Sequence, residues 1–213
     1  MLKRALNVPT LERSWQVAIL LGGLLIGGCG TGRVSAAELD LIVEVLNLEP
    51  GSVVADVGAG DGGWTVQLAD YVGQEGHVWA TEVDRDNVED IEGRILDAFL
   101  DNVTVVQGNQ SASGLPPGCC DAILLRLVYH HFTRPKEMRA SLSRALRPGG
   151  LLAIVDISPQ SSWRDLPEVP DRGGHGIPVA DLIREMTLDG FEVVTRRDEW
   201  NGDEDRFCVV FRR

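Results

Sequence analysis

The chain has 213 residues, of which 44% are hydrophobic, so it is long enough for one domain with a substantial core. Its formal net charge of -12 argues against a protein that grips phosphate backbones, since nucleic-acid binding draws most of its affinity from Lys and Arg. The cysteines show neither a C-x-x-C pair nor the Cys/His spacing of zinc sites, so we expect no disulfide scaffold and no metal site; they are Cys29, Cys119, Cys120 and Cys208.

The first 37 residues differ in composition from the rest. A basic start precedes an apolar run over residues 17–28, which is short against the roughly 20 residues that span a bilayer as a helix and is typical of a secretory signal. Cleavage is expected before Cys29, in a lipoprotein-like IGGC, or before Ala37, after VSA. We therefore expect an exported or membrane-anchored protein, such as a periplasmic or cell-envelope lipoprotein, with its domain over 38–213. An uncleaved anchor with the domain on the cytoplasmic face, or a wrongly assigned start codon, is the alternative.

Helices and strands are expected to alternate after this leader. Amphipathic stripes indicate the helices, and short apolar runs indicate strands buried on both faces of a parallel sheet. The expected order is a helix over 38–48, a strand over 52–58, a helix over 64–72, a strand over 77–84, a helix over 85–102, strands over 103–108 and 121–127, a helix over 135–146 and a strand over 151–157. This alternation is typical of a doubly wound α/β fold with right-handed crossovers.

The C-terminal part departs from that alternation. A last helix is expected over 178–190, followed by strand-like runs over 191–200 and 205–213 with an Asn201-Gly202 hairpin signal between them. We therefore predict a mostly parallel seven-stranded sheet that ends in an antiparallel hairpin and carries helices on both faces. The segment 158–178 has no periodicity, and long loops of this kind often have a function.

A glycine-rich loop follows the first expected strand. Gly58, Gly60 and Gly63 spell G-x-G-x-x-G, and Glu82 stands at the end of the next strand. Glycines at such a turn allow tight bending and a close approach of the backbone to a ligand. The spacing to Glu82 suits an acid that binds ribose hydroxyls, in a dinucleotide or in another adenosine ligand. The G-x-G-x-x-G motif alone is weak evidence, so a dinucleotide and another adenosine ligand both stay open.

Further segments carry a more specific resemblance. Asp56-x-Gly58-x-Gly60-x-Gly62, with Glu82 ending the second strand, resembles the first motifs of the class I S-adenosylmethionine-dependent methyltransferases. Gly108-Asn109-Gln110 stands where that family often has Gly-Asp-Ala, and the segments over 120–132 and 146–156 resemble its fourth-strand motif and its Pro-Gly-Gly turn with the fifth strand. The terminal hairpin also fits the family, and the resemblance covers residues 38–213.

This resemblance implies S-adenosylmethionine as the cofactor and assigns roles to single residues. Asp56 would orient the glycine loop and the methionine amino group, and Glu82 would accept hydrogen bonds from both ribose hydroxyls. Asn109 would meet the adenine amino group, although an Asn that caps a turn is the alternative. Arg126, with Leu127, would border the methionine moiety. The expected cofactor-binding residues are Asp56, Val57, Gly58, Ala59, Gly60, Glu82, Val83, Asn109, Gln110 and Arg126.

Methyl transfer mainly requires that the acceptor be positioned and water excluded, with proton removal where the acceptor is protonated. His130 and His131 follow the fourth strand, at the sheet edge where α/β proteins bind ligands. Each is a candidate general base, with a structural or substrate-lining role as the alternative. His175 lies in the long loop, either closing over the substrate or simply solvated. The acceptor is expected to be a small or lipid-like molecule and not a nucleic acid; its identity and the oligomeric state stay open.

Two other functions are consistent with parts of the sequence. A nicotinamide-dependent oxidoreductase would use the same glycine loop, but Asp56 and the terminal hairpin argue against it. The second function is that of a non-enzymatic exported protein that binds S-adenosylmethionine. It is considered because this cofactor is made in the cytoplasm, so an exported enzyme would need a source of it. Measurements of cofactor binding and of turnover would distinguish the methyltransferase from these two alternatives.

Overall fold

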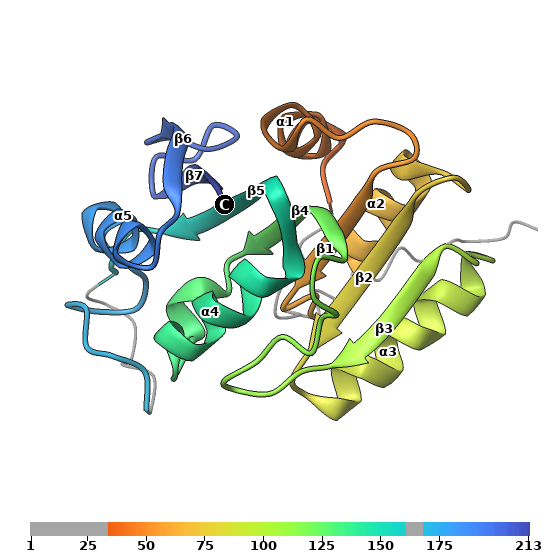
Figure 1. The fold of residues 1–213 in the computed structure, drawn as a ribbon, viewed down its shortest axis with the longest axis horizontal. Coiled ribbons are helices and arrows are strands. Elements are labelled where there is room, and N and C mark those ends of the chain that lie inside the picture. Colours follow the sequence, from red (N-terminus) through yellow and green to blue (C-terminus); the bar gives the residue numbers. More distant parts are fainter. Residues whose placement is uncertain (1–33, 161–167) are drawn as a thin grey trace, which may run out of the picture. The chain divides into compact units, whose positions relative to one another are not determined.

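The strands of the domain form a single sheet in the order β3-β2-β1-β4-β5-β7-β6 (Figure 1). The computed structural model describes residues 34–160 and 168–213, which belong to the compact unit Gly32–Arg213. All neighbouring strands are parallel except β7, which pairs antiparallel with both β5 and β6. The strands are β1 (Val53–Val57), β2 (His77–Glu82), β3 (Val103–Gln107), β4 (Cys120–Arg126), β5 (Leu146–Ile157), β6 (Glu192–Arg197) and β7 (Arg206–Arg212). The predicted doubly wound fold with its terminal hairpin is confirmed.

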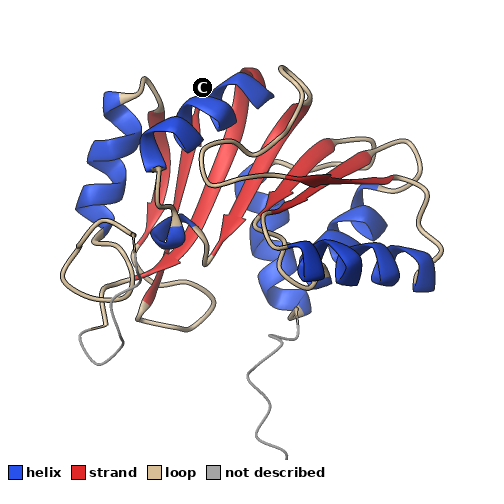
Figure 2. Cartoon of the chain, turned by 90° about the horizontal axis from the view of Figure 1, so that it is seen from below, coloured by secondary structure: helices blue, strands red, loops and turns tan. Residues whose placement is uncertain are grey.

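Helices cover both faces of this sheet (Figure 2). Two buried clusters show the division: one joins Leu68 of α2 to Leu124 of β4, and the other joins Leu142 of α4 to Leu125 of the same strand. Neighbouring strand residues point to opposite faces, so α1 and α2 lie on one side and α4 and α5 on the other. The helices are α1 (Ala36–Leu46), α2 (Gly63–Val72), α3 (Arg85–Asp97), α4 (Pro135–Ala145) and α5 (Val179–Leu188), with a 3-10 turn η1 (Tyr129–His131) after β4.

Several boundaries differ from the predicted ones. The first helix begins at Ala36 because Ser35 caps it, its hydroxyl accepting a hydrogen bond from the Glu38 backbone at 3.0 Å. The α3 helix ends at Asp97, five residues before the expected end at 102. Strand β5 begins at Leu146 and includes the Pro-Gly-Gly segment, which the sequence places in a turn. A register shift opposite that segment, between Cys120 and Ala122, allows the strand to continue through it.

The terminal hairpin turns where the sequence predicts. Asn201 and Gly202 both have positive φ angles, 53° and 77°, as a tight two-residue hairpin turn requires. The turn closes through reciprocal backbone hydrogen bonds between Trp200 and Asp203. Beyond it, β6 forms one edge of the sheet, where charged side chains discourage further strand pairing; they include Glu192, Arg196 and Arg197.

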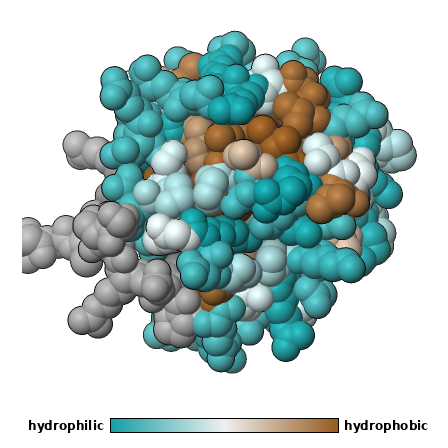
Figure 3. All heavy atoms as spheres, turned by 90° about the vertical axis from the view of Figure 1, so that its left-hand side faces the viewer, coloured by the Kyte–Doolittle hydropathy of each residue, from teal (hydrophilic) through white to brown (hydrophobic). Residues whose placement is uncertain are grey.

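The surface on the side of α5 and β6 is largely hydrophilic with apolar side chains among the polar ones (Figure 3). Leu188, Val193 and Val194 are among the exposed apolar residues of these two elements. No helix within the described residues is both long and apolar enough to span a bilayer. The predicted leader lies outside the described residues, so its membrane attachment stays a prediction.

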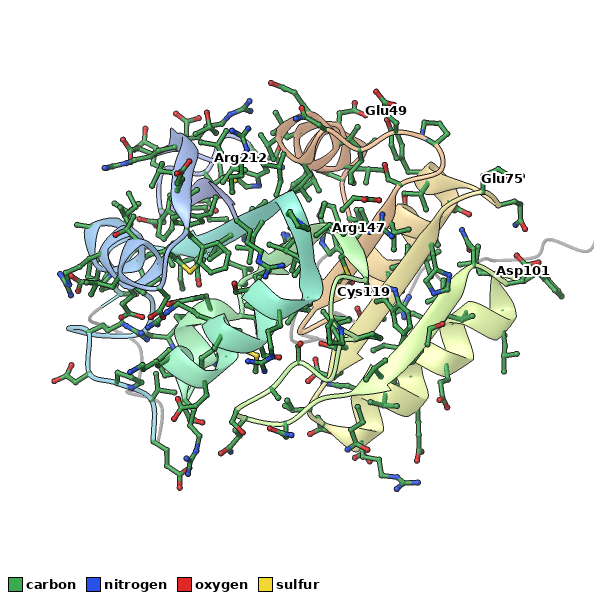
Figure 4. The ribbon with its side chains drawn as sticks, in the orientation of Figure 1. Glu49, Glu75, Asp101, Cys119, Arg147 and Arg212 are labelled. Atoms are coloured by element: carbon green, nitrogen blue, oxygen red, sulfur yellow. The ribbon has the colours of Figure 1, made fainter. Side chains whose placement is uncertain are left out.

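Four of the residues labelled in Figure 4 come shortly before a parallel strand: Glu49, Glu75, Asp101 and Cys119. They mark the amino-terminal edge of the sheet. Among the described residues, Cys119, Cys120 and Cys208 are free thiols. The functional residues predicted from the sequence follow the strands instead and so gather at the opposite, carboxyl-terminal edge.

Candidate active site

The glycine loop joins β1 to α2 and bends through three left-handed residues. Gly58, Gly60 and Gly62 have φ angles of 74°, 55° and 79°. A Cβ on Gly58 would lie 2.4 Å from the Val128 side chain, whereas a Cβ on Gly60 would meet nothing within 4 Å. Gly63 has no such conformation and begins α2. The structural pattern is therefore G-x-G-x-G, with Gly58 packed against the chain after β4 and Gly60 facing open space.

Glu82 joins the glycine loop to the end of β2. One carboxylate oxygen accepts a hydrogen bond from the Gly60 backbone at 2.9 Å, and the other accepts one from the Val83 backbone at 2.7 Å. The residue is 9% exposed. The oxygen that binds Val83 also accepts a hydrogen bond from the Asp84 backbone at 3.3 Å. A ligand hydroxyl would therefore find a free acceptor position on the oxygen that binds Gly60, and on the other oxygen it would share or displace the long Asp84 bond.

Asp56 lies beneath the loop. Its side chain is buried on the α2 face of β1 and accepts a hydrogen bond from the Thr65 hydroxyl at 2.7 Å. Burial, together with the negative charge of Glu82, raises the pKa of Asp56 to about 6 against the opposing effect of the Thr65 hydrogen bond. The Asp56 carboxylate thus ties the loop to α2. Its burial costs more free energy when the group is ionised than when it is protonated.

A cavity of about 170 Å³ opens between the ends of β1, β2 and β4. Its size is below the roughly 300 Å³ at which pockets enclose a whole ligand, so it accommodates part of a nucleoside cofactor. Six predicted cofactor-binding residues line it: Val57, Gly58, Glu82, Val83, Asn109 and Gln110. Asp56, Ala59, Gly60 and Arg126 are not in its wall.

Apolar residues that the resemblance does not single out complete this cavity. Val128, Phe132 and Met138 line it, and His131 stands in the same wall. Phe132 and Met138 are buried and come from the segment after β4 and from α4. The apolar pattern around LVYHHF was the available signal for Phe132, but periodicity cannot distinguish a cavity wall from the core.

Asn109 is held by its own turn. Its side-chain oxygen accepts hydrogen bonds from the Ser111 backbone, the Ser111 hydroxyl and the Ala112 backbone, at 2.9, 2.9 and 3.0 Å. The expected bond from an adenine amino group to this oxygen would have to compete with three existing donors. The geometry thus fits the alternative that Asn109 caps a turn, while the residue still lies in the cavity wall.

Arg126 is engaged away from the cavity. Its guanidinium forms two hydrogen bonds with the Glu38 carboxylate, at 2.8 and 3.0 Å, and lies 5.2 Å from the centre of the Trp64 ring. Glu38 also accepts a hydrogen bond from the Trp200 indole at 3.0 Å. In this structure the predicted border of the methionine moiety is therefore a residue that fastens α1 to the sheet and to the terminal hairpin.

The histidines after β4 meet the loop histidine. His130 is buried; its Nδ1 lies 2.5 Å from the Asp156 carboxylate and its Nε2 lies 3.1 Å from Nε2 of His175. The His131 ring centre is 4.1 Å from that of His130 and 5.3 Å from that of His175. Sequence spacing could not reveal this cluster, because 45 residues separate His130 from His175.

The loop carrying His175 is fixed to β5. The Gln160 backbone donates to the His175 carbonyl at 2.9 Å, and the Ile177 backbone donates to the Ile157 carbonyl at 3.0 Å. Gly176 permits this approach, since its φ is 126° and a Cβ would lie 2.7 Å from the Ile157 carbonyl oxygen. His175 is therefore half-buried against the other two histidines, unlike the simply solvated loop residue that was one expectation.

Two of these imidazoles have lowered pKa values, and His131 has the lower base strength that follows. Partial burial of its ring, and then the positive charges that His130 and His175 could carry, lower the pKa of His131 to about 4, although the residue as a whole is exposed. Burial and His130 also lower the pKa of His175. A base with so low a pKa is mismatched to proton removal near neutral pH. Of the two predicted candidates, His130, with its carboxylate partner, is better placed.

A second cavity, of about 440 Å³, lies beside the histidines. His131 lines both cavities and so stands between them. Leu127, at the end of β4, has a left-handed backbone with a φ of 57°, an uncommon conformation for a branched side chain that is often found at functional sites. The wall consists of Leu127, His130, His131, Ile157, Gln160, His175, Asp203, Asp205 and Arg206.

Comparison with known protein families gives a match over the part of the chain that forms the glycine loop and the cavity beside it. A family model described as a methyltransferase domain matches residues 54–150, which include the glycine loop, Glu82 and the Pro-Gly-Gly segment. Residues 54–150 carry a methyltransferase domain. The prediction of a methyltransferase agrees with this match, and the predicted domain bounds of 38–213 stay a prediction.

Curated relatives of this methyltransferase domain include quinone-modifying enzymes. A demethylmenaquinone methyltransferase of Listeria monocytogenes is 25% identical over 116 residues, 54% of this chain and 49% of the relative. A ubiquinone/menaquinone biosynthesis C-methyltransferase of Teredinibacter turnerae is 29% identical over 122 residues, 56% of this chain and 49% of the relative. The chain thus spans about half the length of these relatives.

Solved structures share the fold of the methyltransferase domain. A SAM-dependent methyltransferase from Aquifex aeolicus superposes with a TM-score of 0.68 at 23% identity, over 81% of this chain and 88% of that one. The methyltransferase CalH in complex with SAH gives 0.65 at 22% identity, over 81% and 54%. The [4+2]-cyclase SpnF gives 0.63 at 16% identity, over 81% and 78%, so the fold alone does not fix the reaction.

Proposed function

We propose that the protein is an S-adenosylmethionine-dependent methyltransferase that acts on a small-molecule or lipid-like acceptor. The observation that carries this proposal is the position of Glu82, whose carboxylate holds the Gly60 backbone at 2.9 Å and also lines the cavity between the strand ends. A carboxylate there suits the two hydroxyls of a ribose. The matched methyltransferase domain supports the same assignment.

The loop fits a sulfonium cofactor better than a dinucleotide. A pyrophosphate needs the free N-H groups and partial positive charge of a helix N-terminus. At the start of α2, the Asp61 carboxylate accepts a hydrogen bond from the Gly63 backbone at 3.2 Å. Asp56 adds a second carboxylate beneath the loop. Asp61 also pairs with Arg94 at 2.7 Å, so its charge is partly offset. A helix start that is already capped by a carboxylate, with a second carboxylate below it, suits a cationic cofactor better than a pyrophosphate.

The chain's own residues would position the acceptor and exclude water. The bound cofactor supplies an activated methyl group. The larger cavity, beyond His131, holds the acceptor, and the buried His130 ring limits water at the junction of the two cavities. His130 donates from Nδ1 to Asp156, so its Nε2 keeps a lone pair directed at that junction.

Turnover of a reduced demethylmenaquinone tests this function, since the relatives above are named for such an acceptor. The full chain is incubated with methyl-labelled S-adenosylmethionine, and label in the organic extract is counted. We expect labelled product from the wild-type chain and from His77→Gln, a change in β2 distant from the site, but far less from Glu82→Gln at a cofactor concentration below saturation. Cofactor binding without transfer to any of a panel of quinols, phenols and lipids would favour a non-enzymatic binding protein.

We also propose that the leader directs export or membrane attachment, with processing at Cys29. Cleavage before Ala37 would remove Ser35, which caps α1 and accepts hydrogen bonds from Glu38 and Asn201 at 3.0 and 3.4 Å. Loss of such a cap typically costs about 1 kcal/mol. Mass spectrometry of the N-terminus of the purified protein, with cell fractionation, is expected to find a modified Cys29 in the membrane fraction. An intact Met1 on a chain facing the cytoplasm would contradict export.

A further inference from the structure

We propose that His130, His131 and His175 form a binding site for a divalent transition metal, Zn²⁺ in particular, at the junction of the two cavities. This site goes beyond methyl transfer and does not depend on it. One ring nitrogen from each histidine lies within 4.8 Å of the others. Imidazole nitrogens in groups of three are a common ligand set for zinc when a fourth position is left open.

The separation of two nitrogens already matches a metal site. His130 Nε2 and His175 Nε2 are 3.1 Å apart. Two ligands on a tetrahedral zinc, each at about 2.0–2.1 Å, are separated by about 3.3 Å. A single shared proton would explain the approach of two rings, but it would not explain why a third imidazole converges on the same point. The His131 nitrogen lies within 4.8 Å of the other two, and its exposed side chain leaves room for the ring to turn toward them.

A buried carboxylate orients His130 as metal sites require. Asp156 is fully buried and accepts hydrogen bonds from the His130 and Ile157 backbones at 3.1 and 2.8 Å. With its oxygens so fixed, it receives the Nδ1 proton of His130 at 2.5 Å. The Nε2 lone pair is thereby directed away from Asp156 toward His175. A carboxylate–histidine pair of this kind sets the tautomer and basicity of ligating histidines.

The open coordination position would face the acceptor cavity. The three histidines line the cavity of about 440 Å³, and His131 also lines the cofactor cavity. An ion held by the three rings therefore lies where the two ligands would meet. Its fourth ligand would be water or an oxygen, nitrogen or sulfur atom of a small molecule in the larger cavity. The same wall holds Asp203, which pairs with Arg206 at 3.0 Å, and Asp205, so its acidic residues add only a small net negative charge.

Zinc titration of the full chain against a chromophoric chelator tests the site. We expect the wild-type chain to bind one Zn²⁺ and His175→Gln to bind it more than 100-fold more weakly. The control is His77→Gln, which removes the histidine that contacts the Thr104 hydroxyl at 3.0 Å in a different part of the sheet and should bind like wild type. Asp156→Asn should weaken binding by about 10- to 100-fold.

Two further measurements separate this inference from its alternatives. Co²⁺ substitution should give tetrahedral bands without a thiolate charge-transfer band; a thiolate band would mean binding at cysteines such as the half-buried Cys119 and would overturn the proposal. Thermal unfolding establishes that His175→Gln is folded. Equal zinc affinity in His175→Gln and His77→Gln, or no zinc binding by the wild-type chain, would also overturn it. Calorimetry with S-adenosylhomocysteine on the same samples shows independently whether the cofactor site is intact.

Discussion

Replacement of Glu82 by Gln should weaken the binding of S-adenosylhomocysteine by about 100-fold. The carboxylate accepts hydrogen bonds from the Gly60 and Val83 backbones and faces the cavity in which the ribose would lie. A Gln side chain presents an N-H₂ group where one of these acceptors stood, so either the loop or a ribose hydroxyl loses its partner. Hydrogen bonds to charged groups contribute about 1.5–3 kcal/mol each, and 2.7 kcal/mol corresponds to about 100-fold.

Isothermal titration calorimetry of the full chain measures this loss. Glu89→Gln is a matched control, because the exposed Glu89 side chain pairs with Arg85 one turn away on α3 at 3.3 Å, at the surface. That variant should bind like wild type, since exposed pairs contribute little. Similar affinities for Glu82→Gln and Glu89→Gln would remove Glu82 from the cofactor site.

Replacement of Asp56 by Asn should stabilise the fold above pH 7 while it impairs cofactor binding. The pKa of Asp56 is raised to about 6 by burial, from an ordinary value of 3.8. Below pH 4 the group is protonated in both the folded and unfolded states. Between about pH 4 and pH 6 the unfolded chain has lost this proton while the folded state keeps it, so stability falls over this range and the full penalty is reached above it. The full penalty is about 3 kcal/mol, of which Asn should recover about 1–3 kcal/mol.

The same protonation should make cofactor affinity depend on pH. If the ionised Asp56 orients the amino group of the cofactor, S-adenosylhomocysteine should bind about tenfold more weakly at pH 5 than at pH 7.5. Asp56→Asn should bind weakly at both pH values with little dependence between them. Calorimetry and urea unfolding at pH 5 and 7.5 check both parts. A variant that keeps full affinity, or that unfolds more easily at pH 7.5, would contradict the role given to this carboxylate.

Much of the fold could be predicted because its signals are local. Short apolar runs marked the parallel strands, and Asn201-Gly202 marked the hairpin through its two left-handed residues. The start of α1 and the path of β5 could not be read in this way. Ser35 is a cap only once a helix follows it, and the Pro-Gly-Gly segment continues a strand because β4 shifts register beside it.

The site residues likewise differ in whether the sequence alone could place them. Glu82 was predictable because its position after β2 fixes it beside the glycine loop. Arg126 was not, since its partner Glu38 is 88 residues away and diverts its guanidinium to α1. Asn109 satisfies its oxygen within its own turn, an outcome that the sequence left open. The histidine cluster depends on a glycine-containing loop folding back onto β5, which no spacing rule describes.

The central claim is that the loop from Gly58 to Gly62 holds a sulfonium cofactor and not a dinucleotide. Thermal unfolding of the full chain with S-adenosylhomocysteine or NADH at equal concentrations tests it most directly, because a ligand that binds only the folded state raises its stability. We predict protection by S-adenosylhomocysteine that is lost in Glu82→Gln, and none by NADH. Protection by NADH alone would contradict the assignment of the site.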